Sequence, residues 1–336
     1  DVYKRQSGYT SQVRNAGHIR NRGYEIQLGA VPIQTSKGFR WNLDLNYGAN
    51  SSKVVKLDDE GLITSYQLYS SGIQILASVG EAYGTLFGTS YVRDANGNVV
   101  VDANGLPKIS TTNKTLGKFT PDWTGGISNT FSYRSLSLSF LIDASVGGSI
   151  FSNTNKTGKY TGVLANTLSG RDAEHGGLWY YTDAMGNNVR LSESPSYSVS
   201  SDGLYYAQVN GQSTRVYQDG IMVEGVTESG SKNEEVVSAE KYYHRIYSIA
   251  EANVYDASYV KLREVALSYR LPRLWTQKLH LQEASVTLTG RNLWTIYKSV
   301  PNIDPESALT TGNAQGVEAY SLPTTRSFGV NLSVKF

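Results

Sequence analysis

Long parts of the sequence alternate strictly between apolar and polar residues, which is the pattern of a β-strand with one apolar face. Seven stretches share this alternation, centred at 24–30, 39–47, 125–133, 136–146, 258–271, 284–294 and 325–336. The last of them closes the chain with the apolar residues Phe328, Val330, Leu332, Val334 and Phe336. We therefore predict an all-β protein. Helical signals are poor, and the best candidate for a helix is the segment 233–252, which is rich in helix formers.

The connections between these strands alternate between short and long. Short joints lie around 31–38, 133–135 and 272–283. Three segments are much longer, at 53–120, 148–256 and 298–324. Short turns on one side and long loops on the other are typical of antiparallel outer-membrane β-barrels, with the long loops extracellular. If the last strand ends in the periplasm, all three long segments lie outside.

Seven is an odd number of strands, whereas complete bacterial outer-membrane barrels of one chain have an even number. An open sheet would leave unpaired strand edges in hydrocarbon, which a membrane does not tolerate. We therefore expect residues 1–336 to be part of a larger transmembrane barrel. The opening residues DVYKRQ contain neither an initiator methionine nor a signal peptide, so we expect a downstream piece of a longer product, with a truncation junction or assembly artefact at DVYKRQ.

Composition excludes several classes of function. The 31 basic and 29 acidic residues nearly cancel, so nucleic acid is not an expected partner. The absence of cysteine excludes disulfides, thiol catalysis and zinc–thiolate sites. The 24 tyrosines suit water–lipid boundaries and wet binding surfaces. A mean hydropathy of −0.34 does not argue against a barrel, because alternating strands keep this average low.

The sequence carries no enzyme signature. It lacks the G-x-S-x-G, H-E-x-x-H, P-loop and dinucleotide-binding motifs. Its histidines, at positions 18, 175, 244 and 280, have no metal-ligand spacing. We expect no enzyme activity, no cofactor and no metal site.

Two motifs in the long segments leave alternatives open. In HGGLWYYTD, the side chains of Trp179, Tyr180 and Tyr181 would either stack on sugar faces or a partner subunit, or pack within their own loop. In NIDPE, Asp304 and Glu306 would form either a catalytic carboxylate pair or structural loop caps. Capping is favoured, because nothing nearby tunes an acid.

Two further motifs have a structural and a functional interpretation. DANGNVVVDANG, within 94–105, contains two Asn-Gly steps and predicts hairpin turns, with a calcium loop as the alternative. In KLRE, Lys261 and Arg263 share parity with Val265 and Leu267, which places them on the same face at its outer end. We expect a charged band whose long side chains snorkel at the membrane boundary, or else contact with a partner or lipopolysaccharide.

Several stretches, in this order along the chain, resemble the C-terminal part of a TonB-dependent outer-membrane transporter of the SusC/RagA family. They are NAGHIRNRGYEIQLGAVPI, YVRDANGNVVVDANGLP, LGKFTPDWTGGISNTFSYRSLSLSFLIDASVGGSIFS, ASYVKLREVALSYRLP, GRNLW with PNIDPE, and LPTTRSFGVNLSVKF. The resemblance spans nearly the whole chain. It implies the last seven strands of a 22-stranded barrel.

The resemblance also implies a function, partners and a location. The chain would form barrel wall and outer loops of an importer of oligosaccharides or, in some members, peptides, in the outer membrane of a Bacteroidetes-like Gram-negative bacterium. Partners would be a SusD-like surface lipoprotein, TonB through an upstream plug, outer-membrane lipid and lipopolysaccharide. The final strand would carry the outer-membrane assembly signal, with Phe328, Val330, Leu332, Val334 and Phe336 facing lipid and Phe336 serving as the terminal aromatic residue.

An extracellular β-sandwich that binds glycans or acts in adhesion is the alternative. A sandwich would also show alternating strands and tyrosine-rich loops. It predicts connections of similar length at both ends of the sheet and an apolar face buried against a second sheet.

Overall fold

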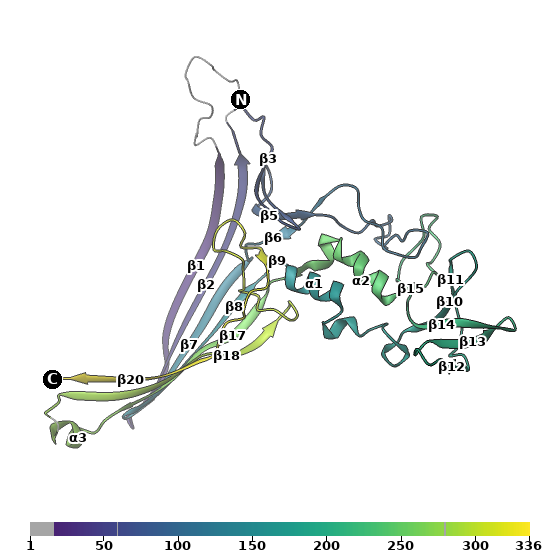
Figure 1. Ribbon diagram of the computed structural model, residues 1–336. Coiled ribbons are helices and arrows are strands. Elements are labelled where there is room, and N and C mark those ends of the chain that lie inside the picture. The colour runs from purple at the N-terminus through teal and green to yellow at the C-terminus, as the bar shows by residue number, and fades with distance from the viewer. Residues whose placement is uncertain (1–16, 59, 279) are drawn as a thin grey trace, which may run out of the picture.

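A computed structural model describes residues 17–58, 60–278 and 280–336 of the chain, and the segment DVYKRQ lies outside these residues. Its largest element is one curved sheet of seven long antiparallel strands (Figure 1). In spatial order the strands are β1 (His18–Gln34), β2 (Phe39–Lys56), β7 (Trp123–Tyr133), β8 (Leu136–Val146), β17 (Tyr259–Arg270), β18 (Glu283–Lys298) and β20 (Ser327–Lys335). These are the seven strands that the alternation predicts. The two edges of the sheet are β1 and β20.

The strand register places apolar residues opposite apolar ones and polar residues opposite polar ones, in rows that cross the whole sheet. Residues directly opposite one another point to the same face. One row crosses all seven strands and is entirely apolar: Ile33, Trp41, Phe131, Leu138, Leu267, Leu288 and Val330. The neighbouring row is entirely polar: Gln34, Arg40, Ser132, Ser137, Ser268, Thr287 and Asn331. The sheet thus has one apolar and one polar face, as period-two alternation requires.

Tight turns join the strands at one end of the sheet. The turn between β7 and β8 consists of Arg134 and Ser135, and Arg134 takes a positive φ of 55°. The turn between β1 and β2 closes where the Gly38 amide donates to the Thr35 carbonyl at 3.1 Å. The longest of these joints folds into the short helix α3 (Arg273–Lys278). The short joints of the sequence therefore all lie at the same end.

The three long segments fold at the opposite end of the sheet, to one side of the far parts of β1 and β2 (Figure 1). We call their described residues, within 57–118, 147–258 and 299–326, the distal lobe. A four-stranded sheet contains β3 (Ser65–Ser70), β4 (Gln74–Ser78), β5 (Tyr83–Gly88) and β6 (Lys114–Lys118). A six-stranded sheet contains β10 (Leu178–Thr182), β11 (Asn188–Arg190), β12 (Tyr197–Val199), β13 (Tyr205–Val209), β14 (Gln212–Ile221) and β15 (Val237–Ser238).

A small three-stranded sheet ties the second and third segments together. It consists of β9 (Ser149–Ser152), β16 (Val254–Asp256) and β19 (Val317–Glu318). One hydrophobic cluster then unites residues of all three segments: Ile73, Ile75, Leu86, Phe151, Ala250 and Val317. The distal lobe is therefore a packed body with its own core.

Helices occupy little of the chain. The main ones are α1 (Asn153–Thr161), capped by the Ser152 hydroxyl, and α2 (Ala239–Tyr247), capped by Ser238. Three 3-10 turns, Ala165–Thr167, Ala173–His175 and Ala250–Asn253, complete the helical structure of the described residues. The helix predicted over 233–252 is thus shorter than expected, because the preceding residues pair with β14 as strand β15. Within the described ranges, no helix has the length and apolar character needed to cross a membrane.

Candidate functional site

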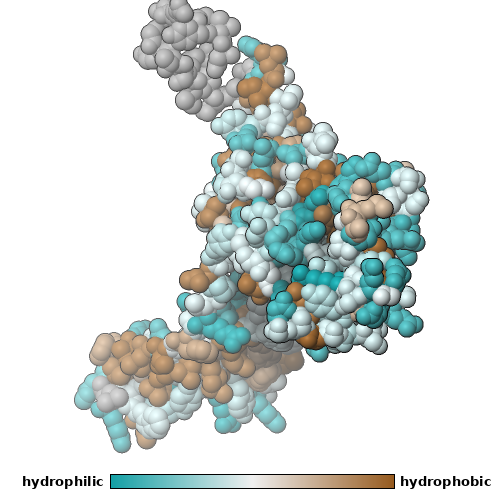
Figure 2. All heavy atoms as spheres, turned by 45° about the vertical axis from the view of Figure 1, so that its right-hand side comes forward, coloured by the Kyte–Doolittle hydropathy of each residue, from teal (hydrophilic) through white to brown (hydrophobic). Residues whose placement is uncertain are grey.

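The apolar face of the seven-stranded sheet is exposed. Phe328, Val330 and Leu332 of β20 are 80%, 74% and 64% exposed. At the other edge of the sheet, Tyr24 is 78% exposed. Figure 2 shows apolar residues gathered over the part of the sheet farthest from the distal lobe. A β-sandwich would bury this face against a second sheet, so the exposure contradicts that alternative.

A β-bulge at Arg263 changes the faces of the KLRE segment. Leu262 lies opposite Ile142, but the next paired residue, Glu264, lies opposite Leu141, so Arg263 is the extra residue. The prediction that Lys261 and Arg263 share the face of Val265 is therefore wrong. Lys261 lies opposite Asp143, on the polar face, because the inserted residue reverses the parity of everything before it.

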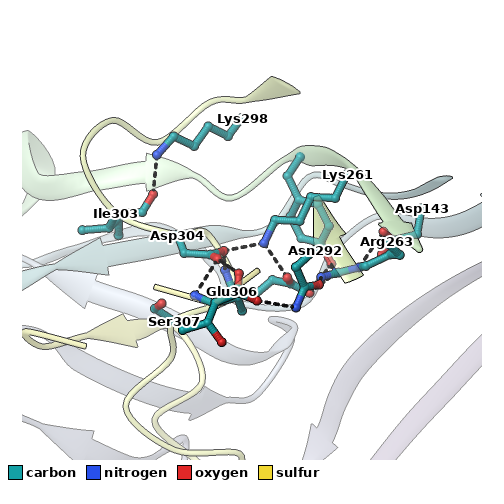
Figure 3. A network of polar contacts seen from close by, with 12 residues as sticks. Asp143, Lys261, Arg263, Asn292, Lys298, Ile303, Asp304, Glu306 and Ser307 are labelled. Atoms are coloured by element: carbon teal, nitrogen blue, oxygen red, sulfur yellow. Dashed lines mark hydrogen bonds and ion pairs between the residues drawn. The ribbon is translucent and has the colours of Figure 1, made fainter. Parts of the chain in front are cut away.

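The predicted snorkelling of these cations is also wrong, because both enter an ionic cluster on the polar face (Figure 3). The Lys261 ammonium lies 2.6 Å from Asp304 Oδ1 and 2.5 Å from Glu306 Oε2, and its side chain is only 3% exposed. Arg263 pairs with Glu306 and, through Nε at 2.7 Å, with Asp143. Tyr259 donates a further hydrogen bond to Glu306 at 2.8 Å.

The two loop carboxyls of this cluster are held ionised. Burial alone would raise the pKa of Asp304, but the hydrogen bonds donated by Lys261 and Thr324 outweigh it and lower the pKa to about 2. Burial opposes ionisation of Glu306 too, and the hydrogen bonds from Arg263 and Lys261 again prevail, so its pKa is lowered. Strong acids of this kind do not exchange protons near neutral pH, so the pair is poorly suited to general acid–base catalysis.

The cluster attaches the third long segment to the wall of the sheet. Asp304 also accepts hydrogen bonds from the amide and hydroxyl of Thr324, at 3.3 and 2.5 Å, and from the Glu306 amide at 3.1 Å. One carboxylate therefore joins the beginning and the end of the segment to Lys261. The loop-capping interpretation of Asp304 and Glu306 agrees with these contacts.

Trp179, Tyr180 and Tyr181 lie on β10, inside the six-stranded sheet. Trp179 is 7% exposed, and its ring stacks on Tyr197 at 5.1 Å and meets the edge of Tyr205 at 5.8 Å. Tyr180 is 4% exposed and stacks on Tyr217 at 5.1 Å. Their ring faces are occupied by neighbouring rings, which favours packing within the loop. Substrate contact by the three residues stays a prediction.

The DANGNVVVDANG segment forms two tight turns. The Asp94 carboxylate accepts the amides of Asn96 and Asn98 at 2.9 and 2.8 Å, and Gly97 takes a φ of 87°. Asp102 closes the second turn in the same way and pairs with Arg245 at 2.9 Å. These contacts support the hairpin interpretation of the motif over the calcium loop.

Comparison with known proteins identifies relatives over the whole length of the chain. No family model matches it. Two TonB-dependent receptors of Formosa agariphila, P3 and P26, are 26% and 25% identical to it over 98% and 99% of its length. The chain spans 30% of the length of each of these two receptors.

Solved structures show the same fold. The chain is similar to the RagAB peptide transporter, with a TM-score of 0.56 at 20% identity over 99% of the chain and 31% of the transporter chain. The same importer in its open-open state gives a TM-score of 0.56 at 18% identity. The resemblance noted in the sequence is thus confirmed, since the curated homologues are TonB-dependent receptors and the RagAB structures share the fold of the chain.

Proposed function

We propose that the chain forms seven strands of the wall, and three outer loops, of a 22-stranded TonB-dependent importer in the outer membrane of a Bacteroidetes-like Gram-negative bacterium. The observation that carries this proposal is the exposed apolar row that crosses all seven strands beside an entirely polar row. In a barrel wall the apolar face meets lipid and the polar face lines the lumen. Strands from upstream in the protein would then pair with the edges β1 and β20.

The direction of the strands supports an extracellular position for the distal lobe. The chain leaves β20 at the end where the tight turns lie, and barrels of this type place tight turns in the periplasm. The segments 53–120, 148–256 and 298–324 then lie outside the cell. Outer-membrane lipid and lipopolysaccharide would surround the wall below them.

For the cargo and partners we propose an oligosaccharide, with a peptide as the second candidate, captured together with a SusD-like surface lipoprotein and moved with energy from TonB. The chain would act without chemistry of its own. Tyr181, the least buried member of the predicted aromatic group, is the best placed of the three to touch a substrate.

The experiment is uptake by cells that carry or lack the complete receptor gene. Deletion should abolish growth on one class of glycan or peptide, and loss of TonB should reproduce that defect. Complementation with the intact gene serves as the control. Unchanged growth on every oligosaccharide and peptide mixture that the parent strain uses would overturn the proposal.

A further inference from the structure

A cavity of about 710 Å³ lies in the distal lobe, among α1, α2 and the end of β14. This volume falls within the range of about 300–1,000 Å³ that small-molecule sites occupy. Much of its wall is apolar, formed by Leu178, Ile221, Met222, Val223 and Ile246. Its single acidic lining residue, Glu224, is exposed.

The wall of this cavity contains a buried cation. Lys159, in the last turn of α1, is 9% exposed, and its ammonium donates to the Ala252 carbonyl at 2.7 Å and to Asn253 Oδ1 at 3.3 Å. No carboxylate of the described residues lies within ion-pair distance of the ammonium, whose remaining contact is with the ring of Tyr255, 5.2 Å from the ring centre. A buried charge with only neutral partners is costly, so an anion at this point would be stabilised.

Two phenols add hydrogen-bond donors to the same cavity. Tyr91 and Tyr242 both line it, and in the described part of the chain neither hydroxyl has a hydrogen-bond partner. Burial raises the pKa of each hydroxyl, so both keep their protons and remain donors. The third tyrosine of the wall, Tyr243, differs, because its hydroxyl already donates to the carbonyls of Asn166 and Ser169.

We propose that this cavity binds a small organic carboxylate with an apolar body, whose anionic end meets Lys159 and the hydroxyls of Tyr91 and Tyr242. A single ammonium matches a single negative charge, and the apolar wall suits a hydrocarbon side chain. The C-terminal end of a short apolar peptide has this chemistry. The proposal does not depend on the proposed import function, because the cavity would hold such a ligand even in a protein that imports nothing.

The test is calorimetric titration of the complete receptor in detergent with N-acetyl-leucyl-leucine and with its C-terminal amide. The acid should bind at least about tenfold more tightly, the difference expected for one charge-assisted hydrogen bond. Lys159→Met should remove this preference and leave binding of the amide unchanged. Lys156→Met is the matched control, because Lys156 lies one turn earlier on α1, over the rings of Phe151 and Tyr247, and does not line the cavity.

Tyr242→Phe keeps the ring and removes only the hydroxyl, so it tests the site without disturbing the packing of Lys159. It should weaken binding of the acid more than that of the amide. Equal affinity of the native receptor for acid and amide would overturn the proposal, as would absence of binding of the acid. Retention of the full preference in either Lys159→Met or Tyr242→Phe would also overturn it.

Discussion

Replacing Lys261 by methionine tests whether the ionic cluster holds the third long segment on the sheet. The variant leaves Asp304 and Glu306 in place but removes the ammonium between them. Breaking a buried ion pair in this way costs about 3–5 kcal/mol. The lower figure applies here, because Thr324 still donates to Asp304, and Arg263 and Tyr259 still donate to Glu306.

The assay is hydrogen–deuterium exchange of the complete receptor in detergent, followed on peptides that cover 303–307 and 322–326. A local loss of about 3 kcal/mol accelerates exchange about a hundredfold, provided that opening is a rapid equilibrium. Arg270→Gln is the matched control, since it breaks a pair with Glu283 in the same sheet whose side chains are 68% and 49% exposed. Such exposed pairs contribute only about 0–1 kcal/mol. Exchange at 303–307 that is no faster in Lys261→Met than in Arg270→Gln would refute the role of the cluster.

Four further predictions concern the same wall and lobe. Because the pKa of Asp304 is lowered from 3.8 to about 2, its contribution to stability is present above its unfolded pKa and is lost as pH falls toward 2. The protection factor of 303–307, which corrects the exchange rate for its intrinsic pH dependence, should therefore hold at pH 5 and fall only below about pH 4. Phe140→Arg, at the middle of β8 on the apolar face, should destabilise the barrel by about 2–4 kcal/mol, whereas Ser139→Arg on the polar face should leave the level of folded receptor in the membrane unchanged. Trp179→Ala should cost the distal lobe about 3–5 kcal/mol of stability, measured by thermal unfolding, and a pure loss of substrate affinity with unchanged stability would instead favour the contact role. Deletion of Phe336 should reduce assembly into the outer membrane, scored by surface labelling, and normal surface levels would contradict the assembly-signal prediction.

The seven wall strands were predictable because each keeps a period of two over most of its length, although a bulge interrupts the alternation in β17. In β20, four apolar residues alternate with five others. The structure pairs three of the four with apolar residues of β18: Val330 with Leu288, Leu332 with Val286, and Val334 with Ala284. A pattern of this kind needs no tertiary information, since one face must meet an apolar phase and the other water. The distal lobe lacks this pattern. Its strands are short and its segments polar, so the alternation indicated only long loops.

The ionic cluster could not be derived from parity alone. Counting by two from Val265 to Lys261 assumes a regular strand, and one extra residue at Arg263 reverses the result. The partners of Lys261 also lie far from it in the sequence. Asp304 is 43 residues away and Glu306 is 45 residues away. The sequence nevertheless carried a signal for this pairing. Two cations lie inside a predicted strand, and two carboxylates of opposite charge lie in the loop that follows the next strand. Neither motif alone identified the other as its partner.

The cluster also explains how the polar face of the sheet can hold the distal lobe in a fixed position. The third long segment begins after β18 and returns to β20, and Asp304 bonds to residues near both of its ends. Lys261 and Arg263 then join that carboxylate pair to β17, while Asp143 extends the ionic contact to β8. Because Val317 of the same segment lies in the core of the lobe with Phe151 and Ile75, the attachment reaches all three long segments. A bulge that turns two cations toward the polar face therefore links the sheet, the segment before the last strand and the core of the distal lobe in one continuous set of contacts.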